Sequence, residues 1–336
     1  MDEKWSGPIE RLSWGGLGVA RGADGRLLLL SAPLALFPGE EVEASVRWKA
    51  RHGEGRVLRW TRFDPRRVPA RCPVAEACGG CDLWGAGECI GELKQAMAAD
   101  LLARQLPEIR DWRWIPAPED ALRHRIQLHW DGRMLGFFRR QSHAVVPVKA
   151  CPAAVEPLSS AIPRLEEALA SRILPQRAQR WELSTGTPAA TVFATSESGR
   201  SWRLDPDGWR AAEEPVVHAQ GRLRLAHRPG GFFQVSAPWA MEAFGNILKA
   251  WDLRGGTLYD LYGGVGLFSA LLGSRFRDRV LVESDGPAVA QAGENLRGMG
   301  LSGECVEADA AEWLQEGLGT TEDLLLASWE LIQQLG

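Results

Sequence analysis

Short apolar segments separated by glycine and polar turns fill the first sixty residues. Apolar and polar positions alternate through GPIERLSWGGLGVAR, then through GRLLLLSAPLALFPGEEVEASV, and again through GEGRVLRW. Alternation with a period of two, interrupted by glycine, is typical of short strands joined by tight turns. The pattern therefore predicts a small β-barrel over residues 1–60.

The period changes twice in the middle of the chain. Residues 63–95 are too irregular for a core of their own, and LKQAMAADLLARQL then places Leu93, Met97, Leu101 and Leu102 on one helical face. Strands are predicted within residues 121–150 (RIQLHW, MLGFFRR and HAVVPVKA), a helix within 151–175, and β structure over 180–225. This stretch is therefore expected to be an α+β region.

From Thr257 onward, strands and helices alternate. LYDLY, VLVE and CVEAD are apolar strands, LFSALLG and AVAQAGENLRG have helical character, and DLLLA at residues 323–327 is a candidate fourth strand. This order predicts a parallel sheet whose ligands bind at the carboxyl ends of the strands.

The composition indicates a globular protein. Of the 336 residues, 45% are hydrophobic and 24% charged, and the chain is long enough for two or three domains. Neither an apolar N-terminal leader nor an apolar run near the ~20 residues of a membrane helix is visible, so a cytoplasmic protein without a membrane segment is expected.

Charge is distributed unevenly. Residues 48–72 hold eight Lys/Arg against two acids, whereas residues 283–336 hold one arginine against eleven acids. Trp48, Trp60 and Phe63 are interleaved with the basic residues, a pattern that fits nucleic acid because phosphates attract arginine and bases stack on aromatic rings. A solvated surface run with some core aromatics is the alternative.

Cysteine spacing supplies the first candidate chemistry. Cys72, Cys78 and Cys81 lie in CPVAEACGGC, and Cys151 precedes a proline in KACPAAVEP. Three thiols within ten residues and a distant fourth favour an iron–sulfur cluster, with a zinc site or inert buried thiols as alternatives. Cys89 is the other candidate for the fourth ligand.

A glycine-rich turn supplies the second candidate chemistry, a cofactor site. Asp260-Leu-Tyr-Gly-Gly-Val-Gly266 joins a strand to a helix, and Glu283 ends the next strand, where a carboxylate can bind ribose hydroxyls. A nicotinamide dinucleotide fits less well than S-adenosylmethionine (SAM), because Ser269 replaces the third glycine of the dinucleotide motif. Asp260 would also repel a pyrophosphate and suits a cationic ammonium.

Taken together, these motifs resemble the RNA uracil-C5 methyltransferases of the 23S rRNA type, to about residue 327. IERLSWGGLGVAR with FPGEEV is similar to the TRAM domain, GGFFQVSAPWAM to the family's F-x-Q-x-N segment, and DLYGGVGLFSALL to its motif I. The resemblance implies an α/β protein with an OB-like TRAM barrel at 1–62, a cysteine-rich α+β domain at 63–228, and an incomplete Rossmann-like class I methyltransferase domain at 229–336.

The resemblance also assigns site residues, an RNA substrate expected to be 23S rRNA, and two cofactors. It implies a [4Fe–4S] cluster held by Cys72, Cys78, Cys81 and Cys151, which favours Cys151 over Cys89. It implies SAM contacts at Gln234, Tyr262, Gly264, Glu283 and Asp309. Cys305, in a strand-like apolar run, is expected to be a core residue.

The sequence departs from the family at several positions. Ser236 stands where asparagine is usual, Gly264 where cysteine is common, and Ser328-Trp329-Glu330-Leu331 where the family has Asp-Pro-Pro-Arg. The nucleophilic cysteine that adds to C6 of uracil, and the glutamate that removes the C5 proton, have no counterpart, so no catalytic residue is assigned.

These departures predict a truncated or frameshifted chain that is inactive as written. A non-catalytic RNA-binding protein is the main alternative, and an iron–sulfur oxidoreductase using a nicotinamide cofactor is a more distant one.

Overall fold

The computed structural model describes residues 2–118, 122–188, 191–315 and 324–327, the last four by their backbone alone. The chain divides into two compact units, one made of Met1–Glu119 with Leu135–Pro152 and the other of Asp120–Met134 with Ala153–Gly336. The chain therefore enters the first unit twice. The three-domain division at residues 62 and 228 stays a prediction.

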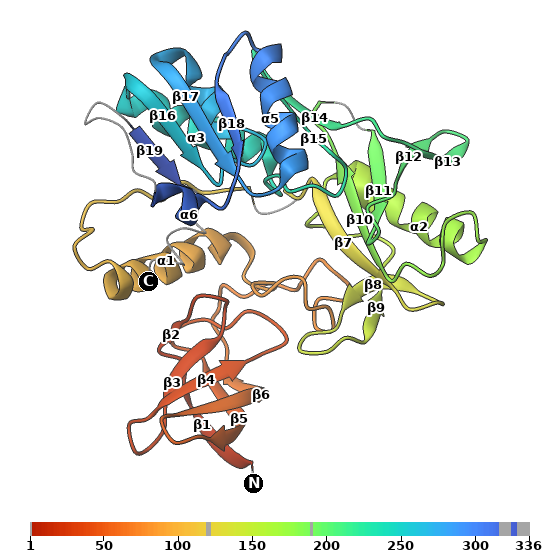
Figure 1. The fold of residues 1–336 in the computed structure, drawn as a ribbon. Helices are drawn as coiled ribbons and strands as arrows, with labels where there is room; N and C mark the ends of the chain where they lie inside the picture. The colour runs from red at the N-terminus through yellow and green to blue at the C-terminus, as the bar shows by residue number, and fades with distance from the viewer. Residues whose placement is uncertain (1, 119–121, 189–190, 316–323, 328–336) are drawn as a thin grey trace. The chain divides into compact units, whose positions relative to one another are not determined.

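Six strands form the sheet of the first unit, in the order β1-β5-β6-β4-β3-β2 (Figure 1). They are β1 (Glu3–Pro8), β2 (Arg11–Leu12), β3 (Gly18–Arg21), β4 (Leu27–Ser31), β5 (Glu41–Trp48) and β6 (His52–Arg62). All neighbours pair antiparallel except β4 and β6, which are parallel. The alternation in the sequence thus becomes a sheet with one apolar side, whose core includes Leu28, Leu30, Phe37 and Val46.

Helix α1 (Ile90–Gln105) packs Leu93 and Met97 against this core. It follows a 3₁₀ turn, η1 (Gly87–Cys89), and so begins inside the segment 63–95 that was expected to be irregular. Leu101 and Leu102 are only half-buried, because the buried stripe is confined to the first half of the helix. The predicted helix is confirmed, with an earlier start and a shorter buried face.

The second passage through this unit forms a hairpin of β8 (Leu135–Phe138) and β9 (Val145–Pro147). In the other unit, β7 (Arg125–Trp130) continues the order β13-β12-β11-β10-β7. Its further strands are β10 (Arg180–Thr185), β11 (Val192–Ser196), β12 (Ser201–Asp205) and β13 (Gly208–Ala211). Helix α2 (Glu156–Ala170) packs on β10 and β11, and β14 (Val216–Gln220) pairs with β15 (Leu223–His227) as a separate hairpin.

The C-terminal sheet is parallel throughout, in the order β18-β17-β16-β19. Its elements are α3 (Ala237–Trp251), β16 (Gly255–Leu261), α4 (Leu267–Leu272), η2 (Gly273–Arg275), β17 (Phe276–Glu283), α5 (Gly286–Gly298), β18 (Glu304–Glu307), α6 (Ala310–Leu314) and β19 (Leu324–Ala327). The predicted parallel sheet and its fourth strand are confirmed.

Both faces of this sheet are apolar. Leu258 of β16 packs with Leu248 of α3 and Leu272 of α4, whereas Leu261 packs with Val282 and Ala310. Since side chains alternate along a strand, positions 258 and 261 face opposite sides. Within the described ranges, no helix has the length and apolarity needed to cross a lipid bilayer.

Candidate functional site

The glycine-rich turn directly follows β16 and reverses the chain tightly. Tyr262, Gly264 and Gly266 all have left-handed backbones, with φ of 52°, 53° and 89°. A Cβ on Gly263 would lie 2.5 Å from Leu281 Cγ, so only glycine fits beside the neighbouring strand. A left-handed conformation at a tyrosine is strained, and such strain is concentrated at functional sites.

Glu283, the last residue of β17, lies in direct contact with this turn. Its Oε2 accepts a hydrogen bond from the Gly264 amide at 3.0 Å, and its Oε1 accepts from the Asp285 amide at 2.9 Å and the Ser284 hydroxyl at 3.2 Å. Two neighbouring strand ends, β16 and β17, therefore bring together the turn and the acid that the sequence singled out. Three donors hold the carboxylate in place before any ligand arrives.

Asp309 lies two residues beyond β18 and caps the short helix α6. Its Oδ1 accepts from the amides of Ala311 and Glu312, at 2.9 and 3.0 Å. The strand itself ends at Glu307, so the expectation that Asp309 ends it was wrong by two residues. Its carboxylate is exposed, with one oxygen committed to the cap.

Asp260 is completely buried, unlike an acid that lines an open phosphate site. Its Oδ2 accepts from the amide and the hydroxyl of Ser269, at 2.9 and 2.7 Å, and so ties the end of β16 to α4. Burial raises the pKa of Asp260 to about 6. Oδ1 is also buried and has no hydrogen-bond partner in the described structure. Ser269, noted in the sequence only as a missing glycine, is thus the partner of this acid.

Gln234 is exposed on the loop before α3, beside an aromatic cluster that sequence reasoning missed. The Phe233 ring stacks on His218 and His227, with centroids 4.9 and 5.2 Å apart, and Arg125 Nη1 donates to the Phe233 carbonyl at 3.4 Å. These contacts fix the backbone next to Gln234. The available signal was one histidine on each strand of a hairpin, paired with Leu225 and Val216 respectively, and their diagonal closeness becomes visible only when the register is known.

Acid should unfold this part of the protein through the two histidines. Burial lowers the pKa of His218 to about 3 and that of His227 to about 4, from an ordinary 6.5. The unfolded chain therefore binds protons first, so stability is complete above pH 6.5 and is lost as the pH falls toward the folded values. At pH 5 each histidine should lower the free energy of unfolding by ~2 kcal/mol, compared with its value above pH 6.5.

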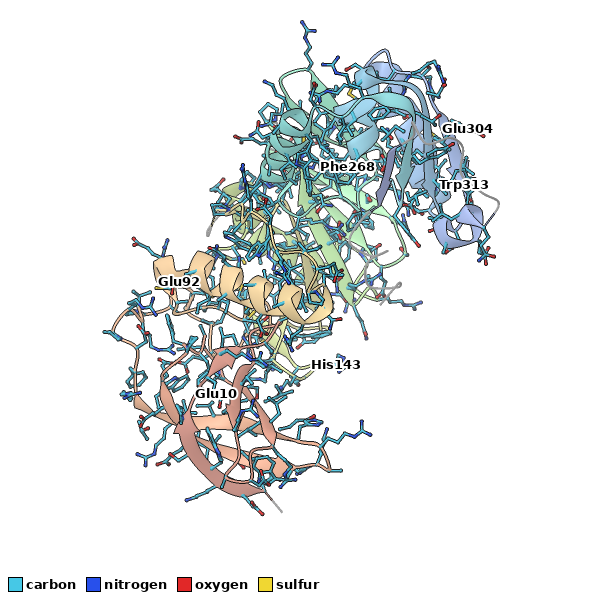
Figure 2. All side chains as sticks on the ribbon, turned by 90° about the vertical axis from the view of Figure 1, so that its left-hand side faces the viewer. Glu10, Glu92, His143, Phe268, Glu304 and Trp313 are labelled. Carbon is cyan, nitrogen blue, oxygen red and sulfur yellow. The ribbon has the colours of Figure 1, made fainter. Side chains whose placement is uncertain are left out.

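Urea unfolding at pH 7.5 and pH 5 measures this loss, and His218→Gln should reduce the difference. An equal pH dependence in wild type and variant would contradict the assignment. His143, a histidine on the exposed Ser142–Ala144 turn, serves as the matched control, because His143→Gln should leave the difference unchanged (Figure 2).

The cysteine segment pairs with the chain just after β8. The Gly79 amide donates to the Phe138 carbonyl at 2.9 Å and the Arg140 amide to the Ala77 carbonyl at 3.2 Å, around a bridge between Cys78 and Arg139. A Cβ on Gly79 would meet that carbonyl at 3.1 Å, which explains the glycine.

All four predicted ligands, Cys72, Cys78, Cys81 and Cys151, belong to the first unit. Burial raises the pKa of Cys78, and the nearby charges of Cys72 and Cys151 raise it further. In the part of the chain that the structure describes, no three Cys, His, Asp or Glu side chains converge closely enough to ligate one metal ion.

Arg140 adds a positive charge beside these thiols. Its Nη2 donates to the Cys81 carbonyl at 2.7 Å and its Nη1 to Asp82 at 2.5 Å, while its buried Nε has no partner in the described structure. A buried N–H without an acceptor suits an anionic group, and a cluster with four thiolates is one. The donor set and this orphan N–H fit the implied cluster.

The remaining two cysteines lie elsewhere. Cys89 is half-buried and packs against the core of the N-terminal sheet, next to the start of α1. Cys305 is half-buried in β18 opposite Leu281, and burial raises its pKa.

The basic segment 48–72 is more internally paired than its composition indicates. Arg67, only 12% exposed, forms an ion pair with the fully buried Glu40. Arg59 pairs with Glu43, and Arg66 pairs with Asp64 and Glu92. The reading of this run as a uniform phosphate-binding stripe therefore needs correction at Arg67, which is a structural residue.

Comparison with known proteins finds relatives in sequence and solved structures of similar fold. No protein-family model matches the chain. It is 30% identical over 327 residues to the 23S rRNA (uracil(1939)-C(5))-methyltransferase RlmD of Pseudomonas putida, covering 86% of this chain and 70% of that protein. It is 26% identical to an uncharacterized RNA methyltransferase of Gloeobacter violaceus, covering 88% of this chain and 75% of the relative.

The structural comparison points to the same kind of fold. The chain matches the tRNA (uracil-54, C5)-methyltransferase of Pyrococcus abyssi, solved in complex with S-adenosyl-L-homocysteine, with a TM-score of 0.66 and 20% identity. The match covers 89% of this chain and 78% of that one. The architecture is thus that of a methyltransferase with mixed α/β content.

Proposed function

Because the chain belongs to the family of 23S rRNA (uracil-C5)-methyltransferases, we propose that it binds SAM and ribosomal RNA for methylation of a uracil at C5. One observation carries the cofactor assignment: the Gly264 amide donates to Glu283 across neighbouring strand ends. Adenosine-type ligands bind at this edge of a parallel sheet, where a carboxylate can bind the ribose hydroxyls.

The proposed SAM site consists of residues from three successive strand ends and the loop before α3. Its members are Gln234, Tyr262, Gly264, Glu283 and Asp309. In this proposal Glu283 would accept from the ribose hydroxyls, Asp309 would lie near the adenine, and Gln234 would contact SAM. When bound, SAM supplies an electrophilic methyl group. The chain orients it through a turn whose backbone is already fixed by Glu283.

We further propose that residues 1–62 are a TRAM-like RNA-binding domain, 63–228 a central domain and 229–336 the SAM-binding domain. In the central domain, Cys72, Cys78, Cys81 and Cys151 hold a [4Fe–4S] cluster, with Arg140 compensating its negative charge. Three thiols in one loop and a fourth just after a hairpin would let the cluster join two segments that are distant in sequence.

The family's cysteine that adds to C6 of uracil has no counterpart among the 336 residues. Cys305 does not replace it, because its pKa is raised and the attacking species is the thiolate. This observation favours a second candidate function for these residues by themselves, namely binding of RNA and SAM without methyl transfer.

The SAM site is tested by Glu283→Gln. The substitution removes the charge that accepts from the ribose, and hydrogen bonds to a charged group contribute about 1.5–3 kcal/mol. Calorimetric titration with SAM should therefore show a dissociation constant roughly 10- to 150-fold higher than that of wild type.

Glu294→Gln, an exposed change on α5, is the matched control and should bind SAM normally. Equal SAM affinity for Glu283→Gln and wild type would refute the site. Incubation with tritiated SAM and an unmodified 23S rRNA transcript separates the two functions, since 5-methyluridine would rule out the purely binding one.

A further inference from the structure

An aromatic side chain in the first unit, Phe63, is exposed above a support formed by Trp60, Glu40 and Arg67. Phe63, directly after β6, is 59% exposed, and its ring stacks on Trp60 with centroids 6.0 Å apart and planes 14° from parallel. A single exposed apolar side chain is ordinary, so what distinguishes Phe63 is the ordered group of residues beneath its ring. The rings are nearly parallel, as in base stacking.

The support under this ring is rigid because one buried carboxylate organises it. Glu40 is 1% exposed, and it accepts from Trp60 Nε1 at 3.0 Å and from the Asp64 amide at 3.1 Å. Arg67 donates to both oxygens of Glu40 and to the Ala35 carbonyl. The residues on either side of Phe63 are thus fixed in place, which lowers the entropy cost of binding.

A cation completes the support. The guanidinium of Arg67 lies over the rings of Trp60 and Phe63, 5.1 and 5.9 Å from their centroids. Phe63 lines an open pocket of about 860 Å³, together with Val68, Cys72 and Pro73 among other residues. This space exceeds the volume of a nucleobase, and its wall is mostly apolar.

We propose that Phe63 is a stacking platform for an unpaired nucleobase of the RNA substrate, which enters the adjoining cavity. The proposal rests on the proposed function and specifies where unpaired RNA is bound. The charge of the neighbourhood favours RNA over an apolar peptide, because residues 48–72 carry eight Lys/Arg against two acids. Arg56 of this segment is exposed and can contact phosphates, whereas the exposed Arg62 is paired with Glu41 at 3.3 Å.

Stacking on one aromatic residue contributes about 1–3 kcal/mol, which corresponds to roughly a 5- to 150-fold change in affinity. Full-length Phe63→Ala should show a loss of this size for a fluorescein-labelled 23S rRNA fragment centred on uridine 1939, the position in the relatives' names. Phe63→Trp should retain the affinity, because it keeps a π face. Leu58→Ala is the matched control, since Leu58 is an exposed apolar residue of β6 at 57%.

Salt separates stacking from charge. The affinity of Phe63→Ala should fall with salt at the wild-type slope, whereas Arg56→Gln should reduce that slope by about one. Unchanged affinity of Phe63→Ala, in a wild type that binds the fragment, would overturn the platform and leave the proposed function intact. A wild type that does not bind the fragment would overturn both.

Discussion

Cys151→Ser should yield colourless protein where anaerobically purified wild type is brown. Wild type should absorb broadly near ~400 nm and contain about four irons per chain, as four thiolates around a [4Fe–4S] cluster imply. The substitution leaves Cys72, Cys78 and Cys81 in one loop, without the thiol that the second passage of the chain brings to the first unit. Iron analysis and absorption spectra measure the loss.

Cys89→Ser is the matched control for this experiment. Cys89 packs against the apolar core of the N-terminal sheet, so its replacement should leave iron content and colour at the wild-type level. Loss of iron from Cys89→Ser, with retention in Cys151→Ser, would reverse the assignment. Stoichiometric zinc without iron in wild type would reject the cluster.

Glu40→Ala should destabilise the first unit by about 3–5 kcal/mol, the range for breaking a buried ion pair by removing one partner. The change leaves Arg67 uncompensated at 12% exposure and removes the acceptor for Trp60 Nε1 and the Asp64 and Phe37 amides. Urea unfolding followed by tryptophan fluorescence should show the loss as a lower transition midpoint.

The neighbouring pair of Glu43 and Arg59 gives the comparison. Arg59 is 67% exposed and its charge is screened by water, so Glu43→Ala should cost far less than Glu40→Ala despite its short ion pair. Equal transition midpoints for Glu40→Ala and Glu43→Ala would show that the Glu40 network stabilises the first unit no more than an exposed ion pair does. Arg67→Glu, which brings two carboxylates together, should resemble Glu40→Ala and therefore cannot serve as a test of phosphate binding.

The elements that could be predicted from the sequence are those whose pattern lies within one short segment of the chain. The parallel sheet followed from apolar runs separated by helical segments, and the glycine turn and Glu283 were found because each ends a strand. The Glu40 network was missed, since its partners lie up to 27 residues away and a lone glutamate after a Pro-Gly turn has no distinctive pattern. His218 and His227 were missed for the same reason, because their stacking on Phe233 depends on the register of a hairpin.

The interrupted path of the chain through the first unit has a consequence for biogenesis. Residues 120–134 belong to the other unit and are synthesised before Leu135–Pro152 returns to the first. A ribosome making this protein therefore releases three of the cysteines before the fourth, so the proposed cluster could be completed only after that return. Closing a loop of this length by a covalent link restricts the unfolded chain by about 4 kcal/mol. An assembled cluster would thus link the two passages of the chain only after both have been synthesised, and it would resist unfolding of the first unit from then on.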